Sequence, residues 1–199
     1  MKKILGMLLG STIGIAALAG QAGAAPLEAC PGAFTADGTA KVFNGGQSAV
    51  SDCQIDRGTD QSDVASIDQI NTSAFFGFSD WQSNDQTQIS AESSSGSWSI
   101  SEADFDAFDY IIVFKDGNAT SLTAFLFNEE FSSGSWSTPF TDPPFNLPGA
   151  STSHEVSHYT IAFRDGGGGG GIPVPEPAAL GLLGLGIAGM AFARRRRIA

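Results

Sequence analysis

Hydrophobic and polar positions divide the chain into two apolar ends and a mixed middle. Residues 4–19 and 178–193 contain no charged side chain. Between them, residues 25–165 show short apolar runs separated by Ser, Gly, Asn and Asp, without a long helical period. Short runs rich in aromatic and β-branched residues, bounded by turn residues, predict β-strands. About 140 residues of this kind are the size of one domain.

The strongest strand signal is the run Asp109–Lys115. Its residues from Tyr110 to Phe114 are apolar on both faces, which is typical of a central strand. The pattern predicts further strands at 120–128, 136–140 and 156–164.

The last of these strands has two distinct faces. Successive side chains of a strand point to opposite sides, so one face is directed to the core and the other carries His158 and Thr160. The core-directed residues are Tyr159, Ile161 and Phe163. We therefore predict an all-β fold for residues 25–165, an antiparallel β-sandwich of jelly-roll-like type.

The N-terminal residues 1–24 have the three regions of a secretory signal peptide. Lys2 and Lys3 precede the apolar run 4–19, and the small residues Ala22–Ala24 follow it. Cleavage by signal peptidase after Ala24 is expected, with an uncleaved anchor as the alternative.

The C-terminal segment 174–199 has three parts: a Pro-Glu-Pro motif, an apolar run and a basic cluster. The apolar residues 178–193 would form a single transmembrane helix of roughly 24 Å, which the cluster stops on the cytoplasmic side. The motif is Pro175, Glu176 and Pro177, and the cluster is Arg194, Arg195, Arg196 and Arg197. Residues 166–173 precede this segment as a glycine-rich linker.

This ending resembles the PEP-CTERM sorting signal of exported bacterial proteins, with a plain C-terminal anchor as the alternative. The resemblance implies an exosortase, an integral-membrane enzyme that is thought to cleave near Pro-Glu-Pro, in a Gram-negative bacterium that makes exopolysaccharide. The middle of the chain also resembles a common domain of such proteins, which implies a small β-sandwich without assigned activity. The resembling residues are Val113–Gly117, Phe125–Phe127, Gly134–Ser137 and Val156–Tyr159.

The two apolar ends also change the picture of charge. The whole segments 1–24 and 174–199 hold six of the ten Lys and Arg and one of the 21 acids, so residues 25–165 carry four basic and twenty acidic side chains, a formal charge of −16. Nucleic acids and anionic lipid surfaces require a positive face, so this balance argues against both. The need of an exported domain to stay soluble explains this acidic charge, which is also compatible with Ca²⁺ binding.

Cys30 and Cys53 both lie in the exported part of the chain. Because exported compartments are oxidising, a disulfide between them is the default. Closing a loop of this length would stabilise the fold by roughly 3 kcal/mol.

The hexapeptide Ser-Ser-Gly-Ser-Trp-Ser occurs twice, at Ser94–Ser99 and Ser132–Ser137. Each copy is interpreted as a turn entering a strand, with its tryptophan facing inward. The alternative is that Trp98, Trp136 or Trp81 is exposed and stacks on sugar rings, which would make the domain a carbohydrate-binding module.

Two further patterns contain residue types that can bind metal ions. His154–His158 matches HExxH, but zinc binding by this motif needs a helix, and the residues that follow alternate as a strand. Asp104 and Asp106 could hold Ca²⁺, against the simpler reading as solvated loop acids. We therefore expect a non-enzymatic surface or matrix protein without a cofactor or catalytic residue, with a metal-dependent hydrolase as the least favoured alternative.

Overall fold

The computed structural model of the 199-residue chain describes residues 27–58, 65–116, 121–147 and 152–166. The expected signal peptide, transmembrane helix, Pro-Glu-Pro motif and arginine cluster lie outside these residues. Among the residues that the structure describes, no helix is long and apolar enough to cross a membrane.

Seven strands form the larger of two sheets, and every pairing in it is antiparallel. Five strands follow one another across this sheet: β1 (Glu28–Ala29), β4 (Val50–Asp56), β9 (Leu122–Phe127), β8 (Phe108–Asp116) and β11 (Val156–Asp165). Two shorter strands pair with different parts of the free side of β11, namely β5 (Gln82–Ser83) and β6 (Ile89–Ser93).

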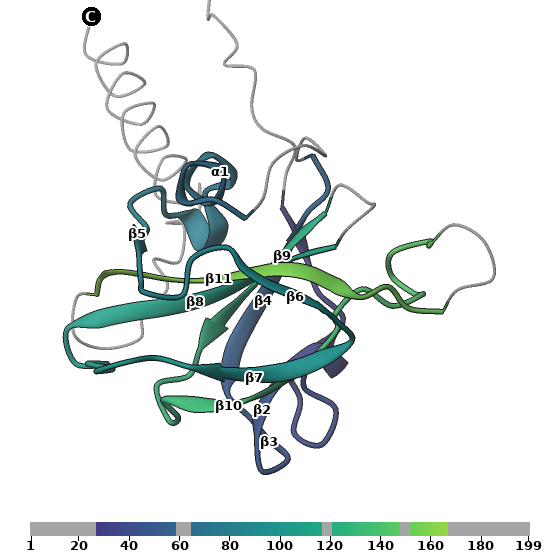
Figure 1. Cartoon of the computed structure of the whole chain (residues 1–199), viewed down its shortest axis with the longest axis horizontal. Coiled ribbons are helices and arrows are strands. Elements are labelled where there is room, and N and C mark those ends of the chain that lie inside the picture. The colour runs from purple at the N-terminus through teal and green to yellow at the C-terminus, as the bar shows by residue number, and fades with distance from the viewer. Residues whose placement is uncertain (1–26, 59–64, 117–120, 148–151, 167–199) are drawn as a thin grey trace, which may run out of the picture.

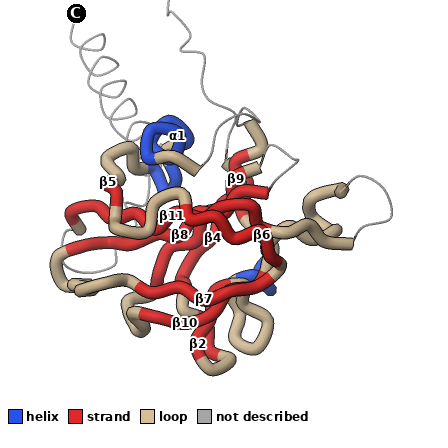
Figure 2. Tube along the Cα trace, in the orientation of Figure 1, coloured by secondary structure: helices blue, strands red, loops and turns tan. Residues whose placement is uncertain are grey.

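Four strands form the small sheet, which lies below the large sheet in Figure 1. Their order is β3 (Gln47–Ser48), β2 (Val42–Asn44), β10 (Ser133–Ser137) and β7 (Ser95–Ser99), again all antiparallel. Figure 2 shows that strands dominate the described chain. The antiparallel all-β prediction is confirmed, and the two sheets are sandwich-like; the jelly-roll-like connectivity stays a prediction.

Strand β8 lies between β9 and β11, in agreement with the prediction of a central strand, and it separates two hydrophobic cores. Tyr110, Ile112 and Phe114 belong to the core between the two sheets. Ile111 and Val113 belong to a second core on the opposite face of the large sheet. The large sheet is therefore buried on both sides, which explains why this strand has no polar face.

The second core is covered by a short helical segment that the hydrophobic pattern did not predict. Helix α1 (Ile67–Ser73) begins at Ser66, whose hydroxyl accepts a hydrogen bond from the backbone of Gln69, and it ends at Ala74 in a left-handed conformation. A 3₁₀ turn, η2 (Phe75–Gly77), follows directly. Seven residues are too few to show a helical period, so the helix depends on packing against the sheet.

The helical cover also buries the face of strand β11 that points away from the small sheet. Tyr159 and Ile161 face the core between the sheets, as expected. Thr160 points the other way but is fully buried, and its hydroxyl donates to the carbonyl of Ala65 at 2.5 Å. The directions of the side chains were predicted correctly, and the second layer above them was missed.

One predicted strand is displaced. The run 136–140 was expected to be extended, but β10 lies at Ser133–Ser137, inside the preceding Ser/Gly stretch. Pro139 has no N–H to donate to a ladder, so the strand ends before it.

The disulfide between Cys30 and Cys53 is present, with 5.4 Å between the Cα atoms. It joins the residue after β1 to the middle of β4, where the backbone N–H of Cys30 also donates to the carbonyl of Cys53. A further 3₁₀ turn, η1 (Gly32–Phe34), follows the first cysteine.

Candidate functional site

The two copies of the repeated hexapeptide lie side by side and pair with each other. β7 and β10 run antiparallel in a register that places Gly96 opposite Trp136 and Gly134 opposite Trp98. Ser97 and Ser135 form the central pair. Each glycine of one copy therefore faces the tryptophan of the other, and the two strands are related by a local two-fold axis.

Each indole fills the space that its opposite glycine leaves open. A Cβ added to Gly96 would lie 2.6 Å from Cζ2 of Trp136, and one added to Gly134 would lie 2.9 Å from Cζ2 of Trp98. The arrangement is not perfectly symmetric, because Nε1 of Trp98 donates to the carbonyl of Ser135 at 3.1 Å whereas Nε1 of Trp136 has no hydrogen-bond partner.

The tryptophans are therefore core residues. Trp98, Trp136 and Trp81 are 3%, 2% and 2% exposed. The inward-facing interpretation of the repeat is confirmed, and the exposed Trp98 or Trp136 that the carbohydrate-binding alternative requires is not found. Trp81 packs in the second core, where α1 covers it and Asn71 bonds both its backbone N–H and its carbonyl.

The opposite face of these two strands is lined with serine hydroxyls. Because side chains alternate along a strand, the residues between the glycines and tryptophans point outward. They form three cross-strand pairs: Ser95 with Ser137, Ser97 with Ser135, and Ser99 with Ser133. Five of these six serines are exposed and Ser137 is half-buried.

The serine rows continue onto β2 through Phe43. Phe43 lies directly opposite Ser135, and the inward-pointing Val42 lies opposite Trp136. Phe43 is half-buried and lines a cavity of about 100 Å³ together with Gly38, Ala40 and Gly46. We call Phe43 and the six paired serines the outer face of the small sheet.

The free edge of β7 is partly closed by side chains. The Ser93 hydroxyl donates to the carbonyl of Ser95, and the Gln86 amide donates to the carbonyl of Ser99. Such caps at both ends discourage the addition of another strand. On the β7 side of the small sheet, the accessible part is therefore the face rather than the edge.

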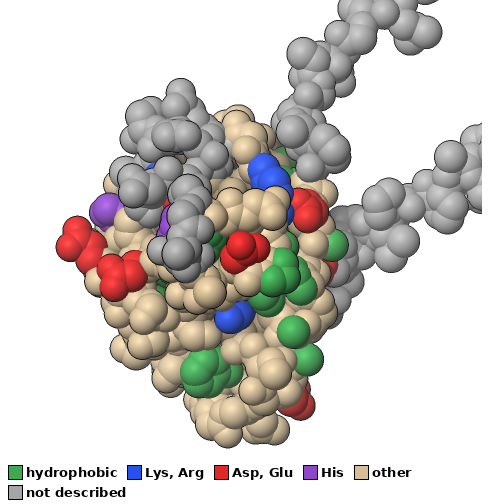
Figure 3. Space-filling view, turned by 90° about the vertical axis from the view of Figure 1, so that its right-hand side faces the viewer, with side chains coloured by type: hydrophobic (Ala, Val, Ile, Leu, Met, Phe, Trp, Pro, Cys, Tyr) green, Lys and Arg blue, Asp and Glu red, His purple; other side chains and the backbone are tan. Residues whose placement is uncertain are grey.

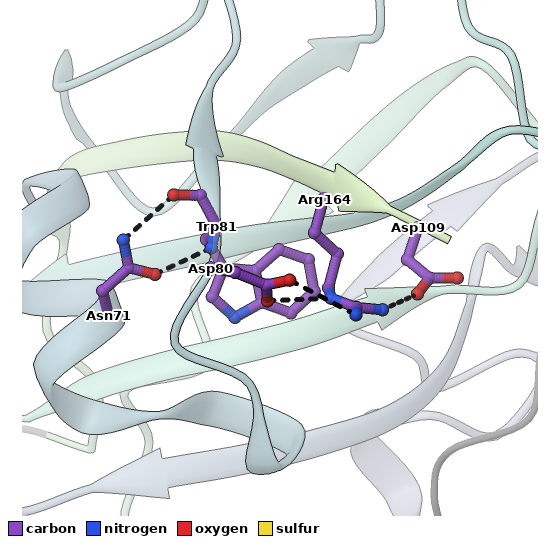
Figure 4. Close-up of polar contacts among 5 residues, drawn as sticks. All are labelled: Asn71, Asp80, Trp81, Asp109 and Arg164. Atoms are coloured by element: carbon purple, nitrogen blue, oxygen red, sulfur yellow. Dashed lines mark hydrogen bonds and ion pairs between the residues drawn. The ribbon is translucent and has the colours of Figure 1, made fainter. Parts of the chain in front are cut away.

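Arg164, near the end of the last strand, ties three parts of the domain together (Figure 4). Its guanidinium lies 3.0 Å from an Asp80 carboxylate oxygen through Nε and 2.6 Å from an Asp109 oxygen through Nη1. It also stacks 3.7 Å from the centroid of the Phe78 ring. Burial lowers the pKa of Arg164, but the hydrogen bonds and charges of the two aspartates outweigh it and raise this pKa overall. We call this group the Arg164 clamp.

Gly166 belongs to the folded domain rather than to the linker. Its N–H donates to the carbonyl of Ala107 at 2.9 Å, and a Cβ added to it would lie 2.9 Å from the backbone nitrogen of Asp109. The close approach of two backbones requires glycine at this position.

The HExxH residues do not form the zinc-binding helix. His154 precedes β11, and His158 lies within it, opposite Lys115. Nδ1 of His154 lies 3.2 Å from a carboxylate oxygen of Asp116, a side chain that is 1% exposed. In the described part of the chain, no group of three or more His, Cys, Asp or Glu residues is placed to hold a metal ion.

Two of the acidic residues, Asp56 and Asp104, accept hydrogen bonds within the fold. Asp56 is buried and accepts hydrogen bonds from the Ser73 hydroxyl and the N–H of Gly58. Asp104 closes a turn by accepting from the N–H of Ala107, and Asp106 is exposed. In the view of Figure 3 the acidic side chains are spread over several parts of the surface, and basic ones are few. Ca²⁺ binding by Asp104 and Asp106 stays a proposal.

These features define a small antiparallel β-domain, and a C-terminal segment follows its last strand in the sequence after a glycine run. That segment, residues 173–197, matches the family model of the PEP-CTERM protein-sorting motif. The chain thus carries the sorting motif predicted from Pro175, Glu176 and Pro177, which implies an exported protein, transiently anchored in the membrane and processed by an exosortase-type enzyme. No curated protein and no solved structure matches the chain.

Proposed function

We propose that this chain is a non-enzymatic protein displayed on the surface of a Gram-negative bacterium or in its exopolysaccharide matrix. Signal peptidase removes residues 1–24, and the exosortase cuts near Pro175–Pro177. The domain is then released from the transmembrane helix 178–193 and the arginine cluster Arg194–Arg197.

The observation that carries this proposal is the position of the sorting motif relative to the folded domain. The matched residues begin at 173, seven positions after Gly166, the last residue that the structure describes, which is packed on the domain. Seven residues span at most about 25 Å when fully extended. The Arg164 clamp holds the strand that precedes this spacer, so an enzyme in the membrane can reach its cut site while the domain stays folded.

The intact mass of the protein from its producing cells tests the proposal, together with its location. We expect a mass that lacks residues 1–24 and all residues beyond the Pro-Glu-Pro motif, in protein recovered from the cell surface or the medium. Protein that keeps Arg194–Arg197 and stays in the membrane fraction would instead be a plain C-terminal anchor, and the proposal would fail.

The matched control replaces the sorting motif and leaves the domain unchanged. A variant with Pro175→Ala, Glu176→Ala and Pro177→Ala should keep its arginine tail and remain in the membrane. A hydrolase would require a different result, namely stoichiometric zinc by elemental analysis of the purified protein together with hydrolytic activity.

A further inference from the structure

We propose that the outer face of the small sheet binds a neutral polysaccharide chain, with Phe43 as the residue on which a sugar ring stacks. This inference rests on the proposed display of the domain among polysaccharides and names the surface that would contact them. It transfers the carbohydrate-binding role from the buried tryptophans to a different aromatic residue.

Phe43 has no part in either hydrophobic core. Every other phenylalanine in the described residues belongs to one of the two cores or packs against one, including the partly exposed Phe78, Phe105 and Phe131. A single exposed apolar side chain is common on protein surfaces. Phe43 differs because it forms one wall of a cavity and stands in line with a row of hydroxyls.

That row crosses three strands. Phe43 is opposite Ser135, which is opposite Ser97, so the three side chains lie on one face at neighbouring positions. Further serines flank this row two residues away on β7 and β10, at Ser95, Ser99, Ser133 and Ser137. A ring that presents an apolar face to Phe43 would therefore place its rim near hydroxyls, each able to donate and to accept a hydrogen bond.

The absence of charged residues on the strands of the small sheet indicates that the bound polysaccharide is uncharged. None of the residues in β2, β3, β7 and β10 is charged, whereas residues 25–165 carry a formal charge of −16. Lys41, which borders the face, is half-buried with its ammonium over the Phe34 ring, and burial lowers its pKa. An anionic chain would be repelled by the domain as a whole, so the face fits an uncharged polyol.

Affinity electrophoresis of the processed protein tests this proposal. Native gels would contain laminarin, dextran or hydroxyethyl cellulose as neutral chains and alginate as the anionic one. We expect retardation by at least one neutral chain and none by alginate. Phe43→Ala, and separately Ser97→Asp with Ser135→Asp, should weaken that binding about tenfold or more, which corresponds to one well-placed stacking contact.

Matched controls separate this face from the rest of the surface. Phe105→Ala removes a partly exposed phenylalanine that packs against the core, and Ser79→Asp adds a charge at an exposed serine outside the small sheet. Both should bind as the unmodified protein does. No retardation by any neutral chain, or unchanged binding by Phe43→Ala, would overturn the inference. The intact mass and the cellular location of the same variants test the sorting proposal independently of the binding assay. Either proposal, sorting or polysaccharide binding, can therefore fail while the other holds.

Discussion

The indole of Trp136 occupies the space where Gly96 lacks a side chain, and a Cβ at residue 96 would lie 2.6 Å from it. The same relationship holds between Trp98 and Gly134, where the added Cβ would also lie 2.3 Å from the carbonyl oxygen of Phe43. The glycines of the repeat are therefore required by the tryptophans of the other copy.

Gly96→Ala and Gly134→Ala should each destabilise the domain by roughly 1–3 kcal/mol, because a rigid indole or a backbone must move. Without a clash, glycine to alanine stabilises by about 0.4–1 kcal/mol through the unfolded chain. Gly32→Ala is the matched control, since its Cβ meets nothing within 4 Å. Urea unfolding of the three variants measures the difference, and equal stability of all three would contradict the packing described.

Gly166→Ala should destabilise the domain by about 1 kcal/mol or more, although this residue opens a run of six glycines. The added Cβ would approach the Asp109 backbone at 2.9 Å and weaken the hydrogen bond from Gly166 to Ala107. Thermal unfolding against the unmodified chain measures the change. A melting temperature that does not fall would show that Gly166 does not pack closely against the Asp109 backbone.

Arg164→Met should cost roughly 1–3 kcal/mol, because it leaves the partly buried Asp109 without its cation and removes the stacking on Phe78. Arg164→Lys should recover little, since an ammonium cannot bond two carboxylates with the geometry of a guanidinium.

Arg57→Met is the matched control for the Arg164 clamp. Arg57 also pairs with a carboxylate, Glu28, and lies over an aromatic ring, Phe145, but the pair is 38% and 51% exposed. Its loss should cost well under 1 kcal/mol. If both arginine variants lose equal stability in urea unfolding, burial is not what makes Arg164 important.

Acid should weaken one end of the large sheet. The pKa of Glu28 is lowered from 4.5, mainly by the hydrogen bond from Arg57; burial opposes this lowering, and the charge of Arg57 adds a smaller contribution to it. Because the folded-state pKa is lower than the unfolded one, this stabilisation is present above about pH 4.5 and is lost as the pH falls through the lowered value. The melting temperatures of the unmodified chain and of Glu28→Gln should therefore converge over this window, and a constant difference would contradict the pairing.

Several elements could be predicted because their signals are local. Strand β8 was found from a run that is apolar on both faces, and β11 from strict alternation. The disulfide followed from two cysteines in an exported chain. The sorting motif is a contiguous signal that needs no tertiary contact, which is why it was found in full.

Other features could not be predicted because they depend on residues far apart in the chain. The Arg164 clamp joins side chains separated by 84 and 55 positions, and nothing near Arg164 in the sequence marks Asp80 or Asp109 as its partners. The short helix α1 has too few residues for a periodic signal, and the cover it places over β11 buries a threonine that alternation alone assigned to an outer face.

The sequence by itself determined that this protein carries an export and sorting motif and that its domain is built from antiparallel strands, because a contiguous motif and an alternating pattern both depend only on consecutive residues. Only the tertiary structure decided which aromatic residues meet solvent. The repeated hexapeptide looks the same in both copies, but its tryptophans became core residues when the copies paired and each indole closed over the other's glycine. The face that remained outside is the one made of serines and Phe43.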